Sequence, residues 1–108
     1  MNDAERRAVR WYRLHGWRIL ATNVWAGGNE VDLIVRRGRE LRFVEVKSKT
    51  GPRYGDPVEA VTDEKQRRVR RAAELWLAAR PELDSLVVAF DVVAVRGRRL
   101  ERLGDAFE

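Results

Sequence analysis

Two carboxylates and a lysine lie in neighbouring β-rich segments, at a spacing that could bring their side chains together. Asp32 is in the segment EVDLIVR, Glu45 and Lys47 are in LRFVEVKSK, and a turn-like stretch from Arg37 to Glu40 separates them. The short connection predicts a β-hairpin. Paired carboxylates of this kind bind Mg²⁺, and a nearby lysine can orient or deprotonate water or stabilise developing negative charge.

The expected turn fixes the register of this hairpin. If Gly38 and Arg39 are its central residues, with glycine first as a type II′ turn prefers, Asp32 stands directly opposite Glu45. Because side chains alternate along a strand, Asp32, Glu45 and Lys47 then share one face. Like charges directly opposite on a sheet are destabilising, so the two carboxylates are either solvated or balanced by something positive, for which a divalent cation is the obvious candidate. An exposed ion-pair ladder is the alternative for Glu45 and Lys47 alone. The register therefore predicts a metal site.

Composition restricts the metal and the chemistry. The chain has no cysteine and a single histidine, His15, which excludes disulfides, thiolate catalysis and a two-histidine site within one chain. A metal must therefore be held mainly by oxygen. The 22 basic and 17 acidic residues give a net charge of +5, as expected of a domain that binds a polyanion. An arginine-rich composition unrelated to binding is the alternative explanation.

The rest of the sequence indicates one small α/β domain, residues 1–108, in which a mixed sheet is flanked by helices. Helical and alternating apolar periodicities predict the order α-β-β-β-α-β, with room for a short final strand after Gly97. Besides the hairpin, the expected elements are a helix over Asp3–His15, a strand over Trp17–Val24, a helical stretch from Val61 that ends at Pro81, and a strand over Leu86–Val95.

Neither membrane insertion nor secretion is indicated by the sequence. No apolar run approaches the length of a bilayer span, and the charged beginning MNDAERRAVR is not followed by an apolar signal segment. We therefore expect a cytoplasmic protein without a membrane partner.

The motifs then resemble a known family. GNEVDLI followed by FVEVKSK is similar to the strand-borne motif of the PD-(D/E)XK nucleases, which have a restriction-endonuclease-like fold. The chain also resembles the small bacterial YraN family, which is similar in fold to archaeal Holliday junction resolvases. The features that run in the order of that family are a helix bearing Glu5, N-x-x-x-x-G-x-E-V-D-L-I, FVEVK, Gly55, Lys65 and FDVVAV. The chain departs from the motif in having Val31 where the name has proline, and Asn29 is inserted after the glycines.

The resemblance implies roles for particular residues. Asp32, Glu45 and the Val46 carbonyl would hold Mg²⁺ or Mn²⁺, Lys47 would be the catalytic lysine, and Glu5 would complete the metal site. The implied activity is a metal-dependent endonuclease acting on structured or branched DNA. Because junction resolution usually needs two sites, a homodimer is a hypothesis by analogy.

Several acidic residues have structural alternatives. Glu5 could close a capping box with Asn2 or point inward from the edge of the apolar helix face. Glu30, predicted opposite Lys47, is expected to pair with and orient that lysine rather than to bind metal directly. Asp91, inside an apolar strand, is expected to accept structural hydrogen bonds rather than to bind metal.

Basic residues near the hairpin are candidate nucleic-acid contacts, with DNA favoured over RNA. A solvated surface is the alternative for the helical run KQRRVRR, and tryptophans are expected in the core or an interface, with Trp25 the least certain. The candidate phosphate contacts are Lys49, Arg53, Lys65, Arg67 and Arg68.

Two other function classes compete with a nuclease. One is a nucleic-acid-binding module that has the same fold and either lacks catalysis or needs a partner for it. The other is a protein-interaction domain whose basic surface is incidental. Opposed carboxylates argue against the first, because binding alone does not need them, and salt-dependent DNA affinity would argue against the second.

Overall fold

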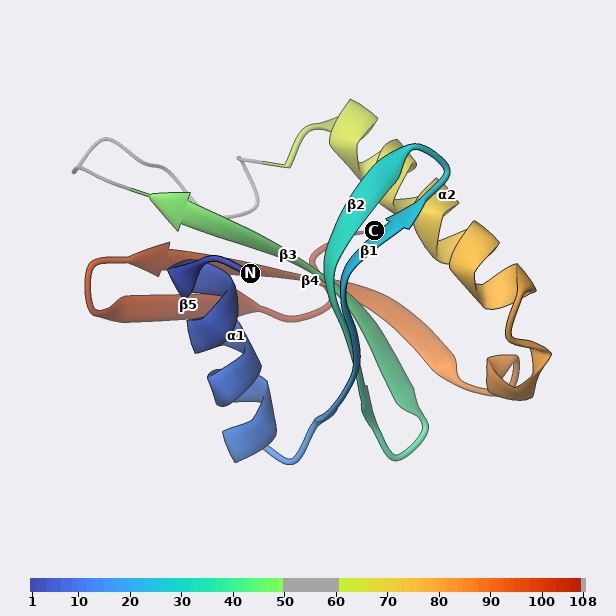
Figure 1. Ribbon diagram of the computed structural model, residues 1–108, viewed down its shortest axis with the longest axis horizontal. Helices are drawn as coiled ribbons and strands as arrows, with labels where there is room; N and C mark the ends of the chain where they lie inside the picture. Colours follow the sequence, from blue (N-terminus) through green and yellow to red (C-terminus); the bar gives the residue numbers. More distant parts are fainter. Residues whose placement is uncertain (50–60, 108) are drawn as a thin grey trace.

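A computed structural model describes residues 1–49 and 61–107 and has one mixed sheet (Figure 1). The strand order is β1-β2-β3-β4-β5, in which β3 and β4 are parallel and the other neighbours are antiparallel. The elements are α1 (Asp3–Leu14), β1 (Arg18–Ala26), β2 (Asn29–Arg37), β3 (Glu40–Lys49), α2 (Asp63–Ala78), the 3₁₀ helix η2 (Pro81–Leu83), β4 (Val87–Arg96) and β5 (Arg99–Leu103). The predicted α/β class and element order are confirmed, including the short final strand.

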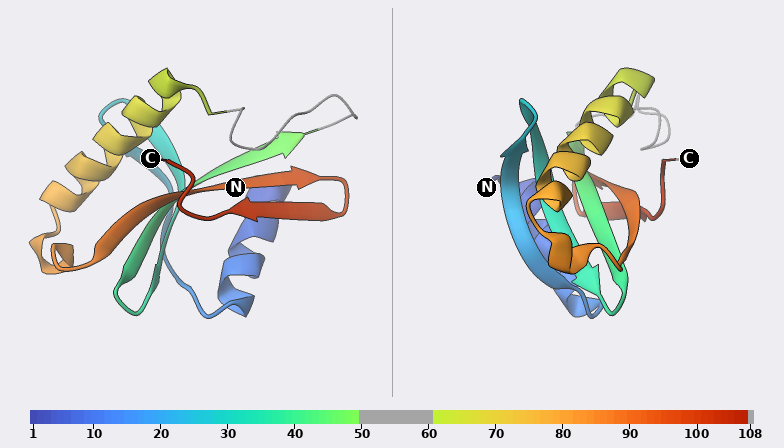
Figure 2. Two further views of the ribbon diagram at one scale, coloured as in Figure 1. Left: turned by 180° about the vertical axis from the view of Figure 1, so that it is seen from behind. Right: turned by 90° about the vertical axis from the view of Figure 1, so that its right-hand side faces the viewer.

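The two α-helices lie on opposite faces of the twisted sheet, as the front and back views show (Figures 1 and 2). Each helix covers a separate buried cluster. Tyr12 of α1 packs in the cluster that contains Leu33 and Val44, whereas Trp76 of α2 packs in the cluster that contains Ile34 and Phe43. Adjacent residues of β2 thus serve different cores, which follows from the alternation of side chains along a strand.

The β2–β3 hairpin has the predicted turn and register. Gly38 has φ +60°, Arg39 is not among the residues with positive φ, and this combination is that of a type II′ turn. Arg37 pairs with Glu40, and the pairing continues to Leu33 and Val44. The regular pairing stops there, one residue before Asp32 and Glu45.

The regular pairing of β2 with β3 ends just before the candidate site. Instead of standing as a ladder pair opposite Glu45, Asp32 accepts a hydrogen bond at Oδ2 from the backbone N–H of Val46, at 2.7 Å. A side-chain oxygen therefore takes the place of a backbone acceptor, which satisfies the Val46 donor where the ladder ends.

The second helix begins later than predicted. Thr62 is the N-cap of α2 and its side chain accepts from the N–H of Lys65, so Val61 lies before the helix although its side chain is buried in the core. A capping threonine satisfies a free donor of the first turn, and this local signal outweighs the apolar periodicity. At the C-terminal end Phe107 is buried, whereas Leu103 is 37% exposed.

Asp91 is fully buried in β4 and is satisfied by structural hydrogen bonds, as predicted. Tyr12 donates to its Oδ2 at 2.7 Å, and Arg102 donates to the same atom at 2.9 Å. Its Oδ1 accepts from the backbone of Asp105 at 3.0 Å and from Arg42 at 3.4 Å. The contact with Tyr12 ties α1 to the central strands. Among the described residues, no helix is long and apolar enough to span a bilayer.

Candidate metal centre

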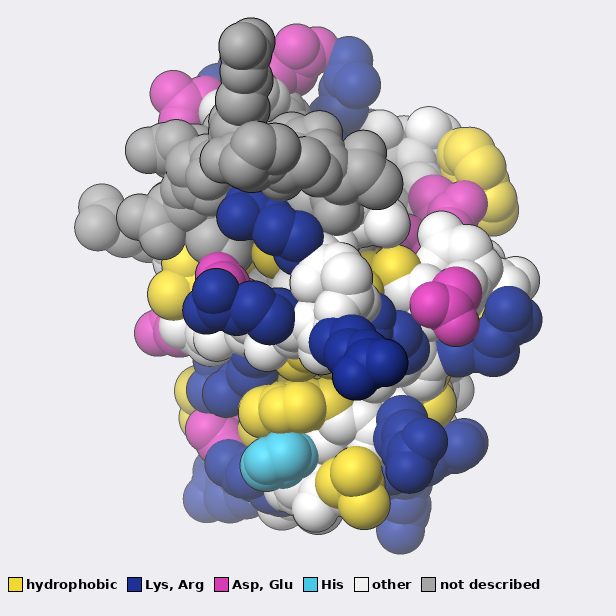
Figure 3. Space-filling model, turned by 90° about the vertical axis from the view of Figure 1, so that its left-hand side faces the viewer, with side chains coloured by type: hydrophobic (Ala, Val, Ile, Leu, Met, Phe, Trp, Pro, Cys, Tyr) yellow, Lys and Arg dark blue, Asp and Glu magenta, His cyan; other side chains and the backbone are white. Residues whose placement is uncertain are grey.

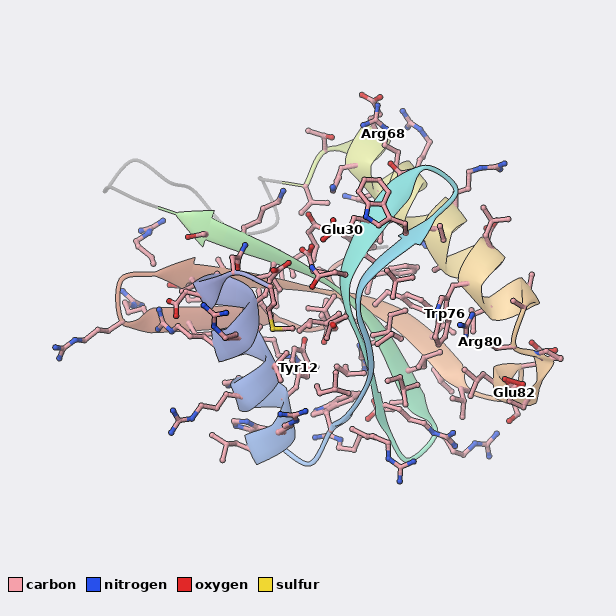
Figure 4. The ribbon with its side chains drawn as sticks, viewed as in Figure 1. Tyr12, Glu30, Arg68, Trp76, Arg80 and Glu82 are labelled. Carbon is pink, nitrogen blue, oxygen red and sulfur yellow. The ribbon has the colours of Figure 1, made fainter. Side chains whose placement is uncertain are left out.

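Three carboxylates from different parts of the sequence meet beside the start of α1. Glu5 comes from the first turn of α1, and Glu30 and Asp32 come from β2. One oxygen of each lies within 4.8 Å of the others. In Figure 4, Glu30 projects from β2 on the side of the sheet where α1 begins. The group can offer at least three oxygen ligands to one hard cation.

Glu5 fulfils both of the roles considered for it. Its Oε1 accepts from the backbone of Asn2, whose own side chain accepts from the Glu5 N–H, so the two form a capping box. The Glu5 side chain is also buried, with a relative exposure of 6%. The capping box therefore holds the carboxylate in its inward position.

Asn23 of β1 joins two of the carboxylates. Its Nδ2 donates to Glu5 Oε2 at 3.0 Å and to Glu30 Oε1 at 2.9 Å. The sequence prediction did not include Asn23 as a site residue. The available signal was an asparagine inside a β-rich run, where asparagine is disfavoured unless a special backbone conformation needs it.

Glu45 and two lysines lie next to this group. Glu45 is buried, and its Oε1 is 3.2 Å from the ammonium of Lys47 and 3.4 Å from that of Lys65. Both lysine side chains are about one-third exposed, at 32% and 34%. The structure thus brings Lys65, which the sequence suggested only as a phosphate contact, from α2 to the predicted site residues Glu45 and Lys47.

The predicted pairing of Glu30 with Lys47 is wrong. Lys47 lies on Glu45, and Glu30 instead accepts from Asn23 and belongs to the group with Glu5 and Asp32. The pairing was extrapolated from the hairpin register, which ends at Leu33 and Val44. Glu30 is therefore positioned as a candidate ligand, the alternative that the sequence pattern had favoured less.

The electrostatics of the centre act most strongly on Asp32. Burial, the charge of Glu45 and the charges of Glu5 and Glu30 raise its pKa from 3.8 to about 7, against the lowering effect of the Val46 hydrogen bond. A carboxylate surrounded by others retains a proton when nothing positive balances the charge. The all-oxygen donor set and its excess of negative charge fit Mg²⁺ or Mn²⁺.

The residues predicted to contact phosphate lie in different parts of the chain. Arg67 and Arg68 are exposed on α2, and Arg68 projects outward and pairs with Glu64 (Figure 4). Lys49 ends β3, but its side chain and the whole of Arg53 lie outside the described residues. Lys and Arg side chains spread over the face shown in Figure 3, with acidic ones scattered among them.

The tryptophans mostly follow the core prediction. Trp17 and Trp76 are buried, and Trp11 is half-buried. Trp25 is 68% exposed and stands opposite Glu30 in the β1–β2 register. His15 is the C-cap residue of α1 and stacks on Trp11.

The fold and site together define a small α/β domain with an acidic cluster held between its first helix and strand β2. Residues 4–95 match the family model described as uncharacterised protein family UPF0102, and the chain belongs to this family. A UPF0102 protein of Klebsiella pneumoniae subsp. pneumoniae is 39% identical over 104 residues, which are 95% of this chain and 81% of the relative. The UPF0102 protein YraN of Escherichia coli (strain K12) and that of Shigella sonnei are each 41% identical over 104 residues, or 95% of this chain and 79% of the relative. The resemblance to the YraN family is confirmed.

Proposed function

We propose that this protein is an endonuclease that needs Mg²⁺ or Mn²⁺ and hydrolyses phosphodiester bonds in structured or branched DNA. The observation that carries the proposal is the convergence of Asp32 with Glu5 and Glu30, next to Glu45 and its two lysines. A structural role does not need this arrangement, because like charges at such distances destabilise the fold. Functional sites commonly retain such destabilising arrangements of charge.

Each residue has a role that follows from its position. Asp32, Glu5 and Glu30 would hold the cation, with Glu45 and the Val46 carbonyl as the further ligands that the motif implies. A bound divalent cation would polarise the scissile phosphate and lower the pKa of an attacking water. Lys47 would stabilise the negative charge that develops on the phosphate, or orient the water. Lys65, whose ammonium lies on the same Glu45 oxygen as that of Lys47, would bind a phosphate oxygen.

A specific observation favours the alternative of a binding module without catalysis. Glu45 already has two ammonium groups on one oxygen, so its charge is balanced without a metal. A protein of that kind would bind DNA through its lysines and arginines and would cleave nothing on its own.

A cleavage screen separates the two functions. The purified protein is incubated with single-stranded, duplex, flap and four-way-junction DNA in Mg²⁺, Mn²⁺ or EDTA. The nuclease should cleave at least one branched substrate in a metal-dependent way, and Glu45→Gln and Lys47→Ala should each abolish cleavage with little loss of DNA affinity. Binding with no cleavage of any substrate would favour the binding module. Cleavage that persists in both variants would show that Glu45 and Lys47 are not the catalytic residues.

A further inference from the structure

Asn23 has a backbone conformation that is unusual for its place in the chain. It lies within β1 and has φ +49°, one of two non-glycine residues with positive φ in the part of the chain that the structure describes. A non-glycine residue in this region carries backbone strain, although asparagine tolerates it better than most residues. The surrounding contacts must therefore hold Asn23 in this conformation.

The strand geometry around Asn23 shows what the conformation achieves. The flanking residues Thr22 and Val24 pair with Leu33 and Val31 of β2, so Asn23 stands at the position opposite Asp32. The register of β1 is also irregular between Ile19 and Ala21, just before this point. From this place the Asn23 amide reaches both the helix-borne Glu5 and the strand-borne Glu30.

The chemical type of the side chain suits the neighbouring carboxylates. A carboxamide nitrogen carries two hydrogens, so it can donate to two acceptors at once without adding a positive charge. A lysine or arginine here would neutralise the group, as Lys47 and Lys65 do for Glu45. An aspartate could not donate. Asparagine can therefore hold two carboxylates together and leave their negative charge available to a cation.

We infer that Asn23 is a positioning residue of the metal centre, which fixes the orientation of the Glu5 and Glu30 carboxylates for the ion. The inference rests on the proposed function, because it assigns Asn23 a role toward the metal that the nuclease needs. Hydrogen bonds to ligating carboxylates orient them, and loss of such a partner typically lowers metal affinity by about 10–100-fold. Asn23 would act through Glu5 and Glu30 and would not bind the ion itself.

The test has two measurements, both without substrate. One is a titration of the metal-free protein with Mn²⁺, which gives the midpoint of binding, and the other is the melting temperature of each protein. Asn23→Gly removes the amide but keeps the positive φ accessible, whereas Asn23→Ala removes the amide and also disfavours the backbone. Both variants should need at least about tenfold more Mn²⁺ than the wild type to reach the midpoint of the titration. Asn29→Ala is the matched control, because the Asn29 amide lies in the same hairpin and, within the described part of the chain, donates to the Gly27 carbonyl alone. Its midpoint should equal that of the wild type.

Three outcomes decide the inference. A raised midpoint in Asn23→Gly and Asn23→Ala, with Asn29→Ala unchanged, supports the positioning role. Lower melting temperatures with unchanged midpoints would show a purely structural residue and overturn the inference while leaving the metal site intact. If Mn²⁺ does not stabilise the wild type at all, the proposed metal centre and the role of Asn23 both fail.

Discussion

At Asp32, burial and neighbouring carboxylates act on the same proton. The pKa of Asp32 rises from 3.8 to about 7, so between these values the folded protein retains a proton that the unfolded chain has released. The contribution of Asp32 to the free energy of unfolding of the metal-free protein therefore falls as the pH rises from about 4 to about 7. The contribution is fully present at low pH, as for any acid whose pKa is raised by folding.

The first prediction follows from this sign. In EDTA, Asp32→Asn should melt above the wild type at about pH 8, because it removes the unfavourable charge while its amide oxygen can still accept from Val46. The difference should shrink toward about pH 4, where Asp32 is protonated and uncharged in the folded wild type. Melting curves by circular dichroism across this range provide the measurement. Equal pH dependence in both proteins would mean that Asp32 does not titrate abnormally.

At the level of elements, the position of α1 depends on the buried group around Asp91. Tyr12 reaches from the helix to the Asp91 carboxylate. Burial of the Tyr12 phenol and the charge of Asp91 raise the pKa of the tyrosine far above its ordinary value. This contact holds α1 against the sheet, and α1 carries Glu5 into the candidate metal centre. The docking of the first helix and the geometry of the site are therefore linked.

The second prediction compares the two ends of that contact. Asp91→Ala should lower the free energy of unfolding by about 3–5 kcal/mol, because it leaves the cationic Arg42 and Arg102 without their buried partner. Tyr12→Phe should cost only about 1 kcal/mol, since it removes one neutral donor from a carboxylate that keeps its other partners. Urea unfolding measures both. An Asp91→Ala variant no less stable than Tyr12→Phe would contradict the account of this network.

The elements that local sequence signals define were predicted well. Gly38 fixed the β2–β3 turn and its register, and the apolar run around Asp91 indicated a strand covered on both faces. What could not be predicted depends on contacts between distant segments. The approach of Lys65 to Glu45 requires the placement of α2, and the left-handed conformation of Asn23 requires Glu5 and Glu30 to be in place already. Extrapolating the ladder by period two past Leu33 produced the incorrect pairing of Glu30 with Lys47.

For the whole molecule, the net charge of +5 should appear as salt-dependent binding to DNA. The third prediction is a steep fall of affinity with salt, since each phosphate contact contributes about 0.9 to the slope of log affinity against log salt for duplex DNA. Arg67→Glu should weaken binding more than Arg68→Glu, because Arg68 already pairs with Glu64. Fluorescence anisotropy at several salt concentrations measures both effects.

The control for this prediction is Arg39→Glu. Arg39 lies in the β2–β3 turn, at the opposite end of β2 from Asp32, and is exposed. This variant changes the net charge by the same amount as Arg67→Glu, so an equal loss of affinity would show that overall charge, rather than α2, attracts the DNA. A flat salt dependence would favour the protein-interaction domain.

The fourth prediction addresses the central claim that Asp32 and its neighbours bind a divalent cation. Wild type and Asp32→Asn are melted in EDTA and in increasing Mg²⁺ at about pH 8. Binding to the folded state should stabilise the wild type by RT ln(1 + [L]/Kd), which is about 2.7 kcal/mol at a hundredfold excess over Kd, whereas Asp32→Asn should gain much less. If Asp32→Asn instead melts below the wild type in EDTA, and Mg²⁺ stabilises both proteins equally, these carboxylates serve only as hydrogen-bond and ion-pair partners within the fold and the metal centre does not exist.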